Sequence, residues 1–168
     1  MAQDEGCFGR ISRAKRGFAP PGIRPHAPAQ VVREYVYVST AVAPAQGKML
    51  SLILPEASTA MMNLFLEQVS QTFSKYFIVM QVDGAGWHHA RELVIPSNVR
   101  LIEQPPSSPE VNPVEHIWDE LREKYFHNRV FASLQSLIDV LCQGLNELAD
   151  DTKRLRSLTG FPHLNVTI

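Results

Sequence analysis

Three carboxylates stand where their side chains could act together on a metal ion or a phosphate group. Asp83 directly follows the apolar run YFIVMQV, Glu115 lies in the segment NPVEHIWDELREKYF, and Asp4 lies close to the first residue. Carboxylate oxygens are the ligands that Mg²⁺ prefers. Each acid also has an ordinary structural interpretation, so no single one of them establishes a site.

Asp83 is placed at the end of a predicted buried strand, where functional sites of α/β sheets gather. Gly84 and Gly86 follow it and would leave its backbone accessible. The alternative is a turn in which the Asp83 side chain bonds to its own backbone, because Asp-Gly is a common turn pair. From this residue alone the turn is the safer interpretation.

Glu115 is the third residue of a helix that Asn112 and Pro113 are suited to begin. A glutamate at this position closes a capping box, in which it only satisfies the backbone of the cap. Glu115 would also lie beside the apolar stripe of that helix, from where its carboxylate could point toward the sheet. Both interpretations remain open on the helix alone.

The elements that must position these acids follow an α/β order. Alternating or continuous apolar runs predict strands, and apolar residues at helical spacing predict helices. Strands are expected over residues 34–42, 48–54, 76–82 and 99–103, and helices from residue 58 to 73, from 113 to 125, from 133 to 148 and from 151 to 158. This order predicts a mixed sheet flanked by helices.

Composition excludes several classes of protein. The 168 residues suit one domain, and the 2 cysteines, Cys7 and Cys142, are too far apart to suggest a disulfide scaffold. No apolar run approaches the roughly 20 residues that span a bilayer, and the first residues do not resemble a signal peptide. We therefore expect no membrane association and a cytoplasmic protein.

The segment from Asp83 to Tyr125 resembles the catalytic core of DDE transposases, in particular the bacterial insertion-sequence relatives of the mariner elements. The family signature is a strand that ends in Asp, a nearby His, and a proline-rich loop that enters a helix bearing the last acid. The matching residues are Asp83, His88, Pro105, Pro106, Ser108, Pro109, Asn112, Pro113 and Glu115. The upstream segment QDEGCFGRISRAKRGFAPPGIRP resembles the first-acid segment, which makes Asp4 the first acid.

This resemblance implies a ribonuclease H-like fold and a DNA transposase. Asp4, Asp83 and Glu115 would be the catalytic residues and the ligands of two Mg²⁺ ions, for which Mn²⁺ could substitute. Water would free a 3′-hydroxyl at the transposon end, and that hydroxyl would attack target DNA. The implied partners are terminal inverted repeats, target DNA and a second copy of the chain in a homodimer, with the protein at the nucleoid when it is bound to DNA.

The resemblance also divides the chain. Residues 1–168 would form the catalytic domain, with a proline-rich basic arm over residues 19–33 and C-terminal helices over 127–168. The family has a helix-turn-helix region before the first acid, and we expect this region and the start of the first strand to be absent. The alternative to an active enzyme is a truncated remnant that only associates with DNA or with intact transposase.

Basic residues near the first acid suggest where DNA would lie. Residues 1–33 carry six Lys or Arg against two acids, whereas the whole chain has a net charge of −1. The expected DNA contacts are Arg10, Arg13, Lys15, Arg16, His88 and Asn112. For His88 we also expect a contact with a carboxylate of the site. A competing interpretation groups Asp83, His88, His89 and His116 as a zinc site.

Overall fold

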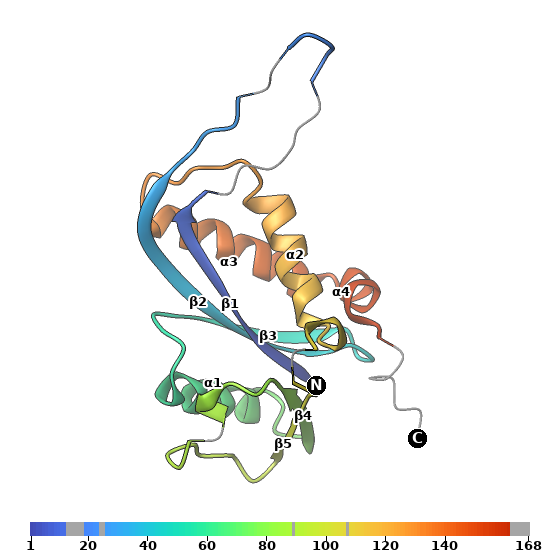
Figure 1. The fold of residues 1–168 in the computed structure, drawn as a ribbon. Helices are drawn as coiled ribbons and strands as arrows, with labels where there is room; N and C mark the ends of the chain where they lie inside the picture. Colours follow the sequence, from blue (N-terminus) through green and yellow to red (C-terminus); the bar gives the residue numbers. More distant parts are fainter. Residues whose placement is uncertain (13–18, 24–25, 89, 107, 162–168) are drawn as a thin grey trace.

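A five-stranded mixed sheet organises the described part of the chain, which in this computed structural model comprises residues 1–12, 19–23, 26–88, 90–106 and 108–161. The strand order is β3-β2-β1-β4-β5 (Figure 1). Strand β1 is antiparallel to β2, and β2 to β3, whereas β4 is parallel to both β1 and β5. The strands are β1 Ala2–Ile11, β2 Val31–Ala43, β3 Lys48–Leu54, β4 Ile78–Val82 and β5 Val99–Glu103.

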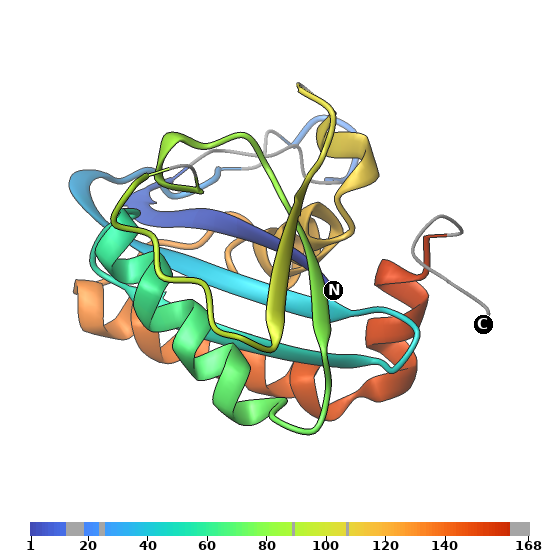
Figure 2. The same cartoon turned by 90° about the horizontal axis from the view of Figure 1, so that it is seen from below.

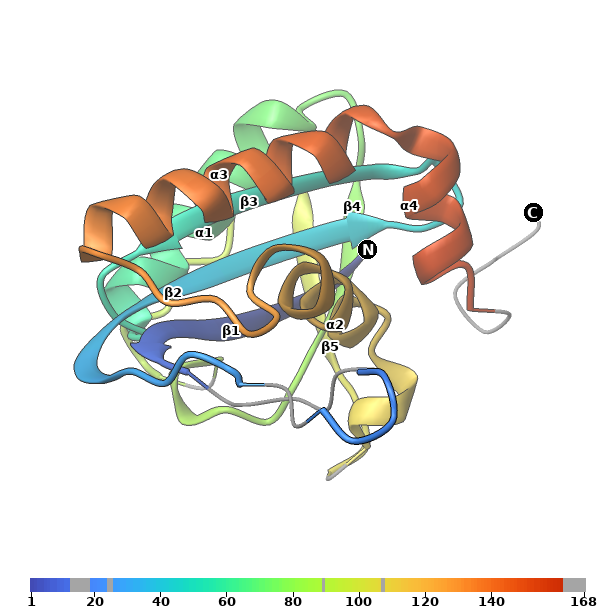
Figure 3. The ribbon, with the colours of Figure 1, turned by 90° about the horizontal axis from the view of Figure 1, so that it is seen from above.

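Helices cover both faces of this sheet. Helix α1 (Thr59–Thr72) lies on one face, and α2 (Val114–Tyr125), α3 (Leu134–Asp150) and α4 (Thr152–Thr159) lie on the other. Figure 2 shows α1 in front of the sheet and α3 behind it, and Figure 3 shows α2 beside β1. None of the helices in the described ranges is long and apolar enough to cross a membrane.

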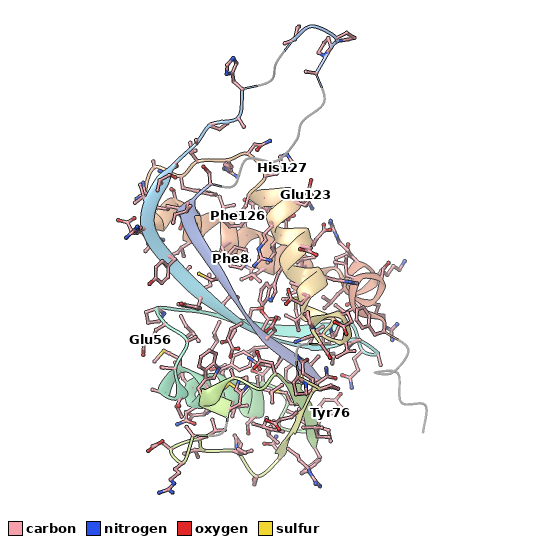
Figure 4. All side chains as sticks on the ribbon, in the orientation of Figure 1. Phe8, Glu56, Tyr76, Glu123, Phe126 and His127 are labelled. Carbon is pink, nitrogen blue, oxygen red and sulfur yellow. The ribbon has the colours of Figure 1, made fainter. Side chains whose placement is uncertain are left out.

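Each face has its own hydrophobic core because side chains alternate along the strands. The aromatic side chain of Phe8 on β1 joins the core under α2 and α3, where its ring lies 5.2 Å from that of Phe126 and 5.8 Å from that of Trp118, centroid to centroid (Figure 4). Met80 on β4 joins the core under α1. The first core holds α2 against the sheet, and the second packs β4 against α1, so the elements that carry the acids are held by buried apolar surface.

The structure differs from the sequence-based expectation at the first two strands. Strand β1 begins at Ala2, just ahead of Asp4, and continues through Gly6 and Gly9, residues that rarely favour a strand. Its ten-residue length comes from pairing with β2, which begins at Val31. The last residues of the expected arm over 19–33 are therefore strand, whereas residues 19–23 are exposed and lie well away from the sheet (Figure 1).

Candidate active site

Parallel pairing of β1 with β4 brings Asp4 and Asp83 to adjacent positions. Ala2 pairs with Gln81, and each aspartate lies two residues beyond its member of this pair. Asp4 shares its face of β1 with Ala2, which packs in the core under α2, whereas Asp83 lies one residue beyond the end of β4. The first two acids of the predicted set therefore lie on neighbouring interior strands or directly after one of them.

The loop before α2 is tied to the same place. Asn112 is buried, and its side-chain Nδ2 donates to the Gln3 carbonyl at 3.0 Å while its Oδ1 accepts from the backbone N–H of Val114 at 3.1 Å. Gln81 Nε2 also donates to the Val111 carbonyl at 3.4 Å. These bonds attach the entrance of α2 to β1 and β4.

Glu115 lies in the first turn of α2 and is not a capping-box residue. The backbone N–H of Asn112, which a capping box would direct to the glutamate, donates instead to the Pro109 carbonyl at 2.9 Å. The negative charge of Glu115 contributes to the raised pKa of Asp4, so the two carboxylates lie within electrostatic reach. Of the two interpretations of Glu115, the structure contradicts the capping box, and it shows a half-buried glutamate within electrostatic reach of Asp4.

Asp4 is the most strongly perturbed of the three acids. Burial raises its pKa to about 7; the hydrogen bond from Trp118 opposes this shift, and the charge of Glu115 adds to it. Trp118 Nε1 donates to Asp4 Oδ2 at 2.9 Å, and a backbone hydrogen bond from Glu5 also lowers the pKa of Asp4. A buried carboxylate beside a second one favours a bound cation, which would neutralise both.

Trp118 packs in the core and also donates to Asp4, a contact that the sequence did not predict. The sequence does hold a signal, because Glu115 and Trp118 are three residues apart on one helix and share a face. Trp118 is also almost completely buried. One helix therefore supplies an acid and the side chain that orients another acid.

Gly6 has no side chain, and this leaves space for the ring of Trp118. A Cβ atom at position 6 would lie 2.9 Å from Trp118 Cδ2 and 2.9 Å from Phe8 Cε2. We expect Gly6→Ala to lower the free energy of unfolding by about 1–3 kcal/mol through overpacking and to weaken Mn²⁺ binding by displacing Trp118 from Asp4. Urea unfolding and Mn²⁺ titration measure the two effects. Gly84→Ala is the control for the unfolding measurement because a Cβ there meets nothing within 4 Å; an equal loss of stability in the two variants would contradict the prediction.

Asp83 makes the hydrogen bond of a turn aspartate and still leaves part of its carboxylate exposed. Its Oδ1 accepts from the backbone N–H of Ala85 at 3.0 Å, as a turn aspartate does. Its side chain is 37% exposed, so part of the carboxylate remains open to solvent. The turn bond fixes the side chain without occupying all of its lone pairs.

His88 faces two carboxylates and not the solvent. Its side chain is 1% exposed, with Nδ1 2.9 Å from the Asp83 carbonyl and 3.0 Å from Asp83 Oδ1. Nε2 lies 3.6 Å from Glu5 Oε1, an ion-pair distance that is too long for a hydrogen bond. Burial lowers the pKa of His88, but Glu5 and Asp83 outweigh it and the pKa is raised. His88 thus contacts a carboxylate of the site, and its burial does not fit a DNA contact.

Two further DNA contacts need correction. Arg10 lies on β1 and donates to the Phe131 and Ala132 carbonyls and to Glu34, so its guanidinium secures the loop before α3. Asn112 is 2% exposed and holds the α2 loop. Both side chains are committed to internal bonds because the loops they hold would otherwise leave backbone carbonyls or amides unpaired. Arg13, Lys15 and Arg16 lie outside the described residues.

The zinc interpretation loses one of its ligands. His116 is exposed, and its Nδ1 lies 2.8 Å from the Leu158 carbonyl, on the side of α2 that faces α4. His89 lies outside the described residues. Within the described ranges, potential ligand atoms of Glu5, Asp83 and His88 lie within 4.8 Å of one another.

The donor set of Asp4, Asp83 and Glu115 fits a hard divalent cation. All three supply carboxylate oxygens, the chemistry that Mg²⁺ and Mn²⁺ accept. Asp4 keeps one oxygen that Trp118 does not hold, and burial makes its negative charge costly until a cation compensates it. The chemistry of these three side chains is therefore that of ligands for a hard divalent cation.

Known solved structures share this fold. The Mos1 strand transfer complex matches with a TM-score of 0.63 at 15% identity over 95% of this chain and 54% of that chain. The catalytic domain of Mos1 mariner transposase matches with a TM-score of 0.56 at 12% identity, over 95% of this chain and 81% of that chain. The chain thus has the ribonuclease H-like fold of that domain and spans about half the length of the Mos1 chain in the complex.

Sequence comparisons give the family. A protein of Sinorhizobium fredii (strain NBRC 101917 / NGR234) described as uncharacterized protein y4pE/y4sA is 33% identical over 125 residues, which are 74% of this chain and 93% of that protein. The family model described as DDE superfamily endonuclease matches residues 1–138. Since that match covers most of the chain and includes all three predicted acids, the chain belongs to the DDE superfamily endonuclease family.

Proposed function

We propose that this chain is the catalytic domain of a DNA transposase, which cleaves DNA at transposon ends and joins the freed 3′-hydroxyl to target DNA. The observation that carries the proposal is the buried carboxylate of Asp4, which lies within electrostatic reach of Glu115 at the start of α2 and on a strand that pairs with the one before Asp83. Membership of the endonuclease family and the likeness to Mos1 complexes with a transposon end support it.

Two divalent ions, Mg²⁺ or Mn²⁺, would activate the attacking oxygen and stabilise the leaving oxygen of an in-line displacement at phosphorus. Mos1 paired-end complexes with Mn and with Mg are among the similar structures. The residues of this chain hold the carboxylates in place: Trp118 orients Asp4, the turn at Ala85 orients Asp83, and Asn112 fixes the start of α2.

The proposed partners are terminal inverted repeats, target DNA and a second copy of the chain. The similar Mos1 structures include a strand transfer complex and a paired-end complex with a transposon end, which supports DNA as the substrate. A site that joins two transposon ends to one target needs two sets of acids, and a homodimer would supply them. Because DNA is the substrate, we also propose action in the bacterial cytoplasm at the nucleoid.

Metal-dependent nicking of DNA tests the proposal. The chain, incubated with supercoiled plasmid and Mn²⁺, is expected to produce nicked circles with 3′-hydroxyl ends, which terminal transferase can label. Chelation with EDTA should stop the reaction, and Asp83→Asn should abolish it. A chain that binds Mn²⁺ but does not nick DNA would be an inactive remnant, and a chain that binds no Mn²⁺ would contradict the metal site.

A further inference from the structure

Glu5 is an acid that the proposed reaction does not use, although it is mostly buried beside the site. Its side chain is 9% exposed and lies on the face of β1 opposite to that of Asp4, because the two are consecutive in one strand. Gln3 Nε2 donates to Glu5 Oε1 at 2.7 Å. A buried carboxylate on the far face of the sheet needs a reason, since its desolvation is costly.

His88 connects this acid to Asp83. The 3₁₀ turn Gly86–His88 follows Asp83 and returns the histidine ring beneath it, with the His88 backbone N–H donating to the Ala85 carbonyl at 2.9 Å. One edge of the ring, Nδ1, faces Asp83, and the other, Nε2, faces Glu5. The ring is thereby held between two elements that are distant in sequence.

We infer that Glu5 and His88 form a positioning pair that fixes the carboxylate of Asp83 for metal binding. This inference rests on the proposed function. The contact with Nδ1 engages Asp83 Oδ1, which also accepts from Ala85, and leaves Oδ2 of Asp83 to face the cation. Glu5 acts through His88, because its carboxylate lies 3.6 Å from Nε2 and attracts that edge of a protonated ring while Nδ1 meets Asp83.

The same three residues could instead bind a metal directly, and the contacts argue against this. The Asp83 carbonyl at 2.9 Å can only accept, so Nδ1 carries a proton and cannot be a ligand. Nε2, the remaining nitrogen, has no hydrogen-bond partner among the described residues, and the oxygen that it faces is that of Glu5. Asp83 Oδ1 lies at the other edge of the ring, next to Nδ1. Only Nε2 and Glu5 could therefore bind a metal together, and Asp83 would not complete the set.

The test measures Mn²⁺ affinity by electron paramagnetic resonance of free Mn²⁺, which does not depend on DNA cleavage. Glu5→Gln and His88→Ala are expected to weaken Mn²⁺ binding about 10-fold or more, the usual effect of residues that orient metal ligands. His88→Asn, which keeps a donor near the position of Nδ1, should recover part of the loss. Glu56→Gln and His26→Asn, at exposed positions, are the matched controls and should bind as the wild type does.

Three outcomes separate the possibilities. Loss of Mn²⁺ binding in Asp4→Asn, Asp83→Asn and Glu115→Gln with normal binding in Glu5→Gln and His88→Ala would overturn the positioning pair alone. Normal binding in the three acid variants would overturn the proposed function itself. A ¹⁴N coupling to bound Mn²⁺ that disappears in His88→Ala would make His88 a ligand and would overturn the positioning role.

Discussion

Glu115→Gln is expected to reduce metal-dependent DNA cleavage by about 100-fold or more, because even residues that only orient metal ligands cost 10–100-fold when they are changed. The substitution keeps the shape of the side chain and removes the charge that would hold a divalent cation. The backbone N–H that a capping glutamate would satisfy already donates to Pro109, so the helix loses no cap. The free energy of unfolding should therefore change by less than about 1 kcal/mol, the scale of a cap interaction.

Asp119→Asn is the matched control for Glu115→Gln. Asp119 lies one turn further along α2, is exposed, and carries the same charge. Cleavage of plasmid DNA with Mn²⁺, together with thermal unfolding, distinguishes the two positions. An inactive Asp119→Asn beside a normally active Glu115→Gln would show that the last acid had been assigned one turn too early.

The element order could be predicted from the sequence because its apolar patterns are strong. The apolar stripe of α3 and the continuous run of β4 gave those elements within a few residues of their observed bounds. Strand β1 could not be found from pattern alone, since Gly6 and Gly9 interrupt it and its strand conformation depends on pairing with β2. Residues 31–33 were not predicted as strand for the same reason, because they extend β2 through its pairing with β1.

The three acids could be proposed from the sequence, whereas the side chains that contact them could not. Asp83 and Glu115 lie in short motifs with characteristic neighbours, and such motifs can be recognised from the sequence alone. The bond from Trp118 to Asp4 and the ring of His88 between Glu5 and Asp83 join residues brought together only by the fold. The prediction for Arg10 has a related explanation. Its positive charge and its place near the first acid suggested a DNA contact, but in the fold its guanidinium donates to the carbonyl of Phe131.

Asp4→Asn is expected to stabilise the metal-free protein at pH 8. In the folded chain the pKa of Asp4 is raised to about 7 from the ordinary value of 3.8, chiefly by burial. Between these values the folded state binds more protons than the unfolded state, so stability falls as the pH rises toward 7 and stays low above it. The destabilisation reaches an upper limit of roughly 4 kcal/mol if the whole shift is realised.

Asparagine removes this titration and keeps an oxygen that can accept the hydrogen bond from Trp118. The variant and the wild type should therefore be similarly stable at pH 4, and the variant should be the more stable at pH 8 when EDTA is present. Adding Mg²⁺ at pH 8 should raise the Tm of the wild type, because the ion binds the folded state alone, and should leave the Tm of Asp4→Asn nearly unchanged. Thermal unfolding across this pH range, with and without Mg²⁺, measures both effects without any DNA. A variant that is less stable than the wild type at pH 8 in EDTA would show that the buried charge of Asp4 is already compensated within the chain, and a cation would then have nothing to neutralise there.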